Sequence, residues 1–249
     1  MKKFLVLFLT LALALALVAC VTPGNGDGSS SPESTPESTP NQNPDPTPTV
    51  LTYAEYMAAE TDTEVTVEAY VQACQGWWDN SITIYAQTSE GGYFFYGITC
   101  SEEDAAKLVA GTKIRVTGTK TVYSGEVEIM GGTLEIIEND TWVAEAADLT
   151  DLLGTDELEA KMNTLAAFKG LTVKEISYKN GEPGDDIYLT LTLGENDYDF
   201  CVEVYLTGTD SDVYTTVGTL EAGDVVDVEC FVYWYEGPNP HIIGVTVAE

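Results

Sequence analysis

The sequence predicts a mainly β protein in which two five-stranded β units follow one another in tandem, with a short helical insertion between them. Three observations support this fold class. Short segments between residues 64 and 248 alternate apolar and polar residues, which is typical of strands that bury one face. Turn-forming Gly, Asp and Asn residues separate these segments. The second half of the chain also repeats the pattern of the first half in constant register, so the two halves should share one architecture.

The N-terminal segment, MKKFLVLFLTLALALALVAC, has the composition of an export signal peptide. Lys2 and Lys3 precede an uncharged stretch, 4–19, that is short for a membrane span. Its end, Leu17 to Cys20, resembles a bacterial lipobox, and the resemblance implies cleavage before Cys20 and lipid on its sulfur. We therefore expect a lipoprotein held by this membrane anchor on the extracytoplasmic face of the cell membrane. The alternative is an ordinary signal peptide with a chance cysteine.

Composition divides the chain into segments. We expect a signal at 1–20, a disordered linker at 21–50, a first barrel at 51–140, a helical connector at 141–169 and a second barrel at 170–249. The linker is rich in Pro, Ser, Thr and Gly and contains no Lys or Arg. Such a segment buries too little apolar surface to offset the entropy of ordering it, so it should hold the folded part away from the membrane.

The chain is strongly acidic. It has 41 Asp and Glu residues against 10 Lys and Arg residues, and its formal net charge is −31. Non-specific affinity for nucleic acid comes mainly from Lys and Arg, so this composition disfavours nucleic acid as a partner. It is typical of a well-solvated extracellular protein.

Four cysteines remain besides Cys20, namely Cys74, Cys100, Cys201 and Cys230. An exported chain can form disulfides, and four cysteines allow three connectivities. Strand alternation places Cys201 and Cys230 on opposite faces, which argues against that pair, and the disulfide state otherwise stays open. The chain has no CxxC motif and a single histidine, so we expect neither a metal site nor a cofactor.

Each unit is expected to contain three strands, a helix and two more strands. In the first unit a short helix at 51–59 precedes strands at 64–71, 81–87, 93–99, 111–123 and 127–137, with a Ser-capped helix at 101–109. In the second unit strands are expected at 171–178, 186–195 and 198–208, after a helical insertion at 148–168. The repeat aligns Leu108 with Leu220, Val116 with Val228 and Tyr123 with Tyr235.

This order of elements is that of the five-stranded OB-fold barrel. The motif LVAGTKIRVTGTKTVYSGEVEI (108–129) resembles the end of OB-fold modules in exported bacterial nucleases and surface proteins. GTDELEAKMNTLAAFKGLTV (154–173) and YWYEGPNPHIIGVTV (233–247) resemble modules of lipoproteins from anaerobic gut bacteria. The resemblance implies a nucleic-acid-binding ancestry.

Aromatic residues near strands two and three are the candidate ligand contacts, because OB barrels bind ligands there and in the flanking loops. The candidates, with two tyrosines of the second unit, are Trp77, Trp78, Asp79, Asn80, Tyr85, Tyr93, Tyr96, Tyr233 and Tyr235. Residues 62–104 contain no Lys or Arg, so the positive track that single-stranded nucleic acid needs is missing. Sugars can stack on aromatic rings without such a track. The alternative is that these aromatics belong to the core.

The expected function is therefore that of a non-catalytic binding module with a glycan or protein ligand. The alternatives are a single-stranded nucleic-acid-binding accessory of an exported nuclease system and a structural spacer. An enzyme is not expected, since the only histidine, His241, aligns with Ile129 and is interpreted as a hairpin-end residue. Acidic turns could bind Ca²⁺, but they lack EF-hand spacing, and solvated turn residues are the favoured interpretation.

The stretch YWYEGPNPHI is interpreted as the end of strand four, a turn and the start of strand five. Alternation places Trp234 on the side of Val228 and Val232, so we expect it in the core. Tyr233 and Tyr235 should then lie on the opposite face, where they could bind a ligand. The oligomeric state stays open.

Overall fold

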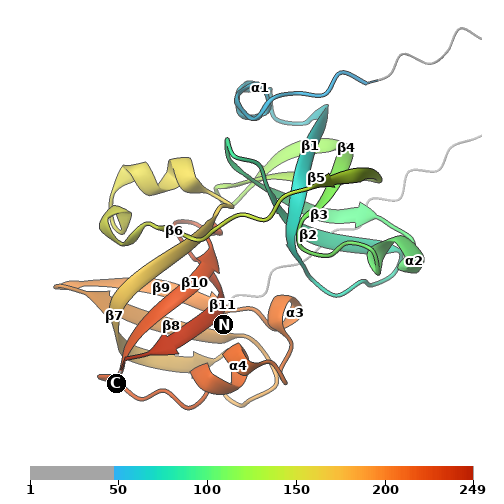
Figure 1. Cartoon of the computed structure of the whole chain (residues 1–249). Helices are drawn as coiled ribbons and strands as arrows, with labels where there is room; N and C mark the ends of the chain where they lie inside the picture. The colour runs from blue at the N-terminus through green and yellow to red at the C-terminus, as the bar shows by residue number, and fades with distance from the viewer. Residues whose placement is uncertain (1–47, 249) are drawn as a thin grey trace, which may run out of the picture. The chain divides into compact units, whose positions relative to one another are not determined.

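Five strands of the first half close into a barrel (Figure 1). Its interior is apolar. The computed structural model describes residues 48–248; the predicted signal, Cys20 and most of the predicted linker lie outside the described residues. The strands are β1 (Thr63–Cys74), β2 (Ser81–Gln87), β3 (Gly92–Thr99), β4 (Thr112–Tyr123) and β5 (Glu126–Thr141), joined in the order β1-β2-β3-β5-β4. β3 and β5 run parallel, and the other neighbours are antiparallel.

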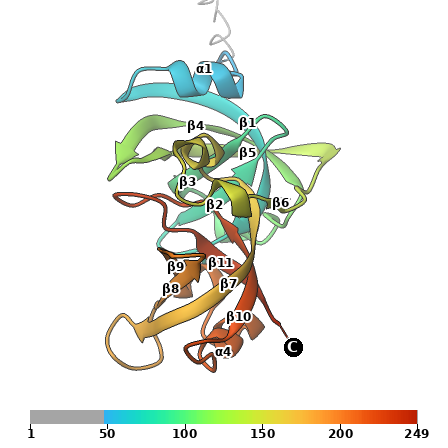
Figure 2. The same cartoon turned by 90° about the vertical axis from the view of Figure 1, so that its left-hand side faces the viewer.

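Two short helices complete the first barrel. α1 (Tyr53–Ala58) begins at a capping box formed by Thr52 and Glu55 and lies beside β1 (Figure 2). The buried Lys120 of β4 donates hydrogen bonds of 2.7 to 2.8 Å to three carbonyl groups at the end of this helix. α2 (Glu102–Ala105) begins after Ser101, as predicted, but it is a single turn that ends before 109.

The second half repeats this architecture. Its strands are β7 (Leu165–Tyr178), β8 (Ile187–Leu193), β9 (Asn196–Val202), β10 (Val225–Phe231) and β11 (His241–Val247). They form a sheet in the order β10-β11-β9-β8-β7, and a further pairing of β7 with β10 joins its ends. α3 (Val204–Thr207) and α4 (Asp212–Val217) lie between β9 and β10 in sequence. In both halves the third and fifth strands are parallel, so the predicted mainly β fold and OB-like strand order are confirmed.

The predicted helix at 148–168 is wrong in most of its length. The short strand β6 (Ala147–Asp148) pairs with β7 and is followed by two 3₁₀ helices, η1 (Thr150–Leu152) and η2 (Asp156–Lys161). Residues 165–168 belong to β7 instead. Ala166 and Phe168 are buried in the second core and face β10, so the period-two alternation of this stretch prevails over its helical propensity.

Two predicted strands end early. The strand expected at 198–208 stops at Val202. Val204 begins α3, and its backbone N–H donates to the Asp186 carboxylate. The fourth strand of the second barrel stops at Phe231 rather than continuing through Tyr235, because the Tyr233 N–H turns back to the Phe231 carbonyl. Trp234 is therefore half-buried in a loop and not in the core as predicted.

A third apolar cluster joins the two barrels. Tyr85 and Phe94 of the first barrel pack with Phe231 of the second, and the rings of Tyr85 and Phe231 stack with centroids 4.3 Å apart. The connector also passes very close to the β2–β3 turn. A Cβ atom at Gly92 would lie 2.2 Å from the backbone of Asn163, so this position requires glycine.

Glu126, at the start of β5, forms polar contacts with both the connector and the second barrel. Its carboxylate accepts a hydrogen bond from the Asn163 side-chain amide and another, 2.9 Å long, from the Trp234 N–H. The side chain is fully buried and no cation pairs with it within residues 48–248. Burial raises the pKa of Glu126 to about 8.

The described residues contain four cysteines, all of them free: Cys74, Cys100, Cys201 and Cys230. Burial raises the pKa of the Cys74 thiol to about 12. Within residues 48–248 no helix has the length and apolar character needed to cross a membrane. The same residues include no cluster of three or more His, Cys, Asp or Glu side chains suited to a metal ion.

We predict that Glu126→Gln changes how stability depends on pH. A carboxyl whose folded pKa is raised contributes stability below its ordinary value, near 4.5, and this contribution is lost as pH rises towards about 8. Glutamine keeps the shape and stays neutral throughout this range, so the variant lacks this titration. As pH rises from about 4.5 to about 8, the free energy of unfolding of the wild type, measured in urea, should fall relative to that of Glu126→Gln. The fall should be up to about 1.4 kcal/mol per pH unit.

The matched control for this measurement is Glu145→Gln, which changes an exposed acid by the same charge. Its stability should follow that of the wild type at every pH. Parallel curves for Glu126→Gln and the wild type would show that Glu126 is ionised in the folded chain across the whole interval.

Candidate functional site

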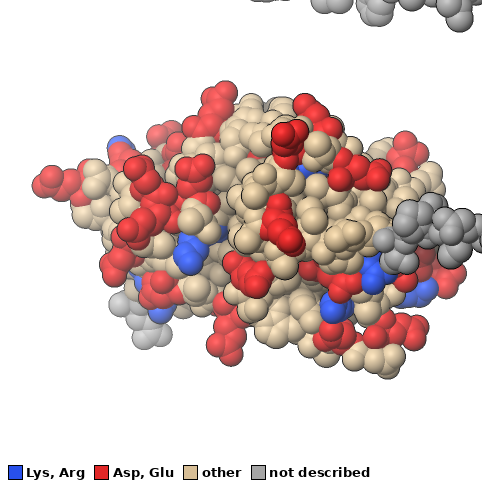
Figure 3. Space-filling view, turned by 90° about the horizontal axis from the view of Figure 1, so that it is seen from above, with Lys and Arg blue, Asp and Glu red and all other residues tan. Residues whose placement is uncertain are grey.

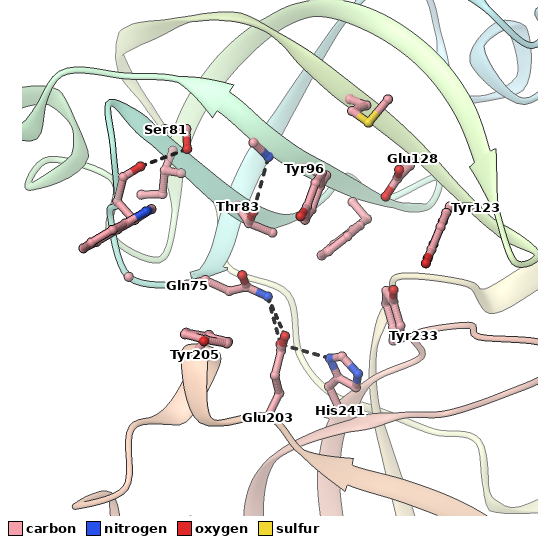
Figure 4. Close-up of a pocket in the computed structure, with 16 residues that line it drawn as sticks. Gln75, Ser81, Thr83, Tyr96, Tyr123, Glu128, Glu203, Tyr205, Tyr233 and His241 are labelled. Carbon is pink, nitrogen blue, oxygen red and sulfur yellow. Dashed lines mark hydrogen bonds and ion pairs between the residues drawn. The ribbon is translucent and has the colours of Figure 1, made fainter. Parts of the chain in front are cut away.

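A cleft of about 910 Å³ lies between the β2–β3 face of the first barrel and the α3 region of the second barrel (Figure 4). Aromatic rings form much of its lining, from Trp78, Phe94, Tyr96, Tyr123, Tyr205 and Tyr233. Polar side chains lie among these rings, from Gln75, Ser81, Thr83, Glu128, Glu203 and His241. The cleft thus combines apolar faces with hydrogen-bonding groups, which is typical of small-molecule sites.

A tight turn presents Trp78 at the edge of the cleft. The Trp78 and Ser81 backbones exchange two hydrogen bonds, of 3.0 and 2.9 Å, across Asp79 and Asn80. Both turn residues have positive φ, 47° and 60°, as a two-residue hairpin turn requires. Trp78 is 79% exposed, whereas Trp77 packs on the first core and donates its indole N–H to the Cys100 carbonyl.

A β-bulge directs Tyr96 towards the cleft. Tyr96 and Gly97 of β3 together oppose the single residue Thr83 of β2. Gly97 has a φ of 60°, and its N–H donates to the Thr83 hydroxyl. Bulges of this kind change the direction of a side chain, and Tyr96 is accordingly half-exposed. Glu128, on the neighbouring strand β5, lies beside Tyr96 on the same wall (Figure 4).

Glu203, His241 and Tyr233 of the second barrel form the opposite wall (Figure 4). Glu203 accepts two hydrogen bonds of 2.9 Å from the Gln75 side chain of the first barrel, and it lies 3.3 Å from His241 Nδ1. The same nitrogen lies 2.8 Å from the Tyr85 hydroxyl. Tyr233 stacks on the His241 ring with centroids 4.2 Å apart. This wall is therefore held rigidly by groups from both barrels.

Electrostatics favour cationic or neutral ligands in this cleft. Within residues 48–248 its charged lining consists of Glu128 and Glu203, and no Lys or Arg contributes to it. Acidic side chains also predominate over the face of the molecule shown in Figure 3. Arg115 and Lys113, which the sequence placed on strand four, are engaged by Glu68 on β1 and by other acids.

The candidate residues named from the sequence divide into four groups. Trp78, Tyr96 and Tyr233 line the cleft. Trp77, Tyr85 and Tyr93 are packed against the cores or the junction between barrels, while Asp79 and Asn80 form the turn after Trp78. Tyr235 lies in a second hollow of about 480 Å³, together with Tyr188 and Pro238.

Sequence reasoning missed Tyr123, Tyr205, Gln75, Glu128 and Glu203, and it interpreted His241 as a hairpin-end residue, which it is, at the start of β11. Only Tyr123 carried a signal, because the repeat aligns it with Tyr235. Gln75 and Glu203 contact each other across 128 positions of sequence, and Glu128 comes beside Tyr96 only through the pairing of β3 with β5.

No protein-family model matches the chain, and no curated protein matches it. Solved structures with similar folds include a murine DNA binding protein bound with double-stranded DNA, at 13% identity and a TM-score of 0.37, over 74% of this chain and 96% of that one. The p204 HINb domain has 10% identity and a TM-score of 0.35 over 76% and 100%. Aspartyl tRNA synthetase from Entamoeba histolytica has 17% identity and a TM-score of 0.31 over 39% of this chain and 23% of the synthetase. These similarities are weak and concern OB-like folds alone.

Stability measurements should separate the structural aromatics from the exposed ones. Tyr85→Phe removes a buried hydroxyl that contacts His241, and we expect it to cost about 1 to 2 kcal/mol of unfolding free energy. Trp78→Ala alters an exposed side chain and should change stability by less than about 0.5 kcal/mol. Urea unfolding of the full-length chain measures both. Equal effects of the two substitutions would contradict this division.

Proposed function

We propose that this chain is a non-catalytic carbohydrate-binding module, carried on the extracytoplasmic face of the membrane by lipid on Cys20. The observation that supports this function best is the cleft lined by aromatic rings and by uncharged or acidic hydrogen-bonding groups. The C–H faces of a sugar pack on aromatic rings, and its hydroxyl groups donate to carboxylate and amide oxygens. OB-like barrels bind oligosaccharides as well as oligonucleotides on this face.

Rigidity of the cleft walls also supports binding. The backbone of Trp78 is fixed by its two hydrogen bonds with Ser81 across a tight turn, and Glu203 is held by Gln75 and His241. A ligand that enters a preformed site orders few side chains, so less of its interaction energy is lost to entropy.

Single-stranded nucleic acid is a poorer fit to the same cleft. Its phosphates would lie beside Glu128 and Glu203 without any Lys or Arg in the lining formed by residues 48–248. Binding of a phosphate backbone depends on such cations and weakens steeply with salt. Aromatic rings beside two acids and no cation therefore favour an uncharged or cationic ligand over a nucleic acid.

Calorimetric titration of the full-length chain with a panel of oligosaccharides tests this function. We expect at least one oligosaccharide to bind, and Trp78→Ala to weaken that binding at least about tenfold, which corresponds to about 1.4 kcal/mol. Tyr188→Ala is the matched control, because Tyr188 is an exposed aromatic of the second barrel outside this cleft. This variant should bind the oligosaccharide with the affinity of the wild type.

Single-stranded oligonucleotides at two salt concentrations form the second arm of this titration. Salt-sensitive binding of an oligonucleotide, together with no response to the sugars, would replace the proposed function by nucleic-acid binding. No response in either arm would contradict both functions and leave a protein ligand or the role of a structural spacer.

Lipid anchoring has a separate test. Cys20→Ser removes the sulfur that would carry the lipid, so the variant should no longer incorporate a labelled fatty acid in a bacterial host. It should also move from the detergent phase to the aqueous phase on partitioning. Unchanged labelling would show that the lipid is attached to another residue.

A further inference from the structure

We infer that the carbohydrate bound in this cleft carries free amino groups, and that Glu128 binds one of them as an ammonium ion between the surrounding aromatic rings. This inference rests on the proposed function and specifies the chemical class of its ligand. It also assigns Glu128, which no sequence pattern distinguishes, as the residue that determines specificity.

Glu128 is a buried carboxylate that opens towards the cleft. Its residue surface is only 5% exposed, yet it lines the cleft on the wall between Tyr96 and Tyr123 (Figure 4). Within residues 48–248 its single hydrogen-bond donor is the Thr121 hydroxyl, at 3.2 Å from Oε1. Oε2 therefore remains free to accept a hydrogen bond from a ligand.

The other acids near the junction are satisfied by the protein itself. Glu203 has Gln75 and His241, and Glu126 has Asn163 and the Trp234 backbone. Glu128 has no comparable set of partners. A carboxylate held in this way is costly unless a counterion or several donors reach it, and burial accordingly raises its pKa. A bound ammonium would stabilise the charged form and offset that cost.

The rings around Glu128 suit the same group. Tyr96, Tyr123 and Tyr233 line the cleft near it, and aromatic faces attract cations such as ammonium groups. The strongly negative net charge raises the local concentration of cations in such a hollow. A neutral sugar can donate hydrogen bonds to Glu128, but it lacks the attraction of a cation to the carboxylate and to the aromatic faces. An acidic sugar would be repelled by both Glu128 and Glu203.

The test compares two ligands that differ at each sugar in one substituent, a free amine or an acetylated one: the glucosamine tetramer and the N-acetylglucosamine tetramer. Both are titrated calorimetrically into the full-length chain at neutral pH and at two salt concentrations. We expect the amino tetramer to bind at least about tenfold more tightly, with a preference that falls as salt increases. Glu128→Gln should remove this preference and leave weak binding of both ligands.

Two controls keep the result interpretable. Glu128→Gln is nearly isosteric and can still accept from Thr121, and its thermal unfolding should confirm that it folds. Glu145→Gln removes the same charge from an exposed position outside the cleft and should retain the full preference. Loss of the preference in both variants would mean that the overall negative charge selects the amine, and this would overturn the role of Glu128.

The failure of this inference differs from the failure of the proposed function. Binding of the acetylated tetramer as tightly as the amino tetramer would overturn the inference, while carbohydrate binding would stand. An amino preference that survives Glu128→Gln would overturn the inference in the same way. If neither tetramer nor any sugar of the neutral panel binds, the proposed function itself is wrong and the inference is overturned with it.

Discussion

Packing of Tyr85 against Phe231 is the contact on which the rest of this structure depends. The stacked rings, with Phe94 beside them, join two barrels that otherwise have separate cores. The Tyr85 hydroxyl then fixes His241, and Gln75 fixes Glu203, so the second barrel is held against the β2–β3 face of the first. The cleft exists because this face is only partly covered. Apolar burial at one end of the junction thus leaves an aromatic surface accessible at the other.

The fold could be predicted from the sequence because its signals are local. Alternating residues such as Val65, Val67 and Ala69 indicate a strand by themselves, and the repeat extends the assignment to the second half. The errors arose where tertiary contacts overrule local patterns. Ala166 and Phe168 belong to a strand because their side chains are buried in the second core. Trp234 lies outside the core, and its backbone N–H donates a hydrogen bond to Glu126.

The candidate site was predictable only in part for the same reason. Trp78 and Tyr96 belong to the segment where OB-like barrels bind ligands, so their position pointed to a surface role. Glu203 and His241 lie in the second barrel and Glu128 in the first, so the three share one cleft only because the two barrels dock. In a chain with 41 acidic residues, no local feature distinguishes the two carboxylates of the cleft from the others. The contact between the barrels, and not the repeat, brings these two carboxylates into one cleft.

The origin of the cleft walls in two copies of one repeat has an evolutionary consequence. Gln75 and Glu203 bond to each other from different copies, so a single-copy ancestor would have possessed half of the site. Once the copies docked, their aligned positions were free to specialise. Ile129 stays inside its barrel, whereas His241, aligned with it in the other copy, supports the shared wall. Duplication in such a chain would thus create a new binding surface rather than a second example of an old one.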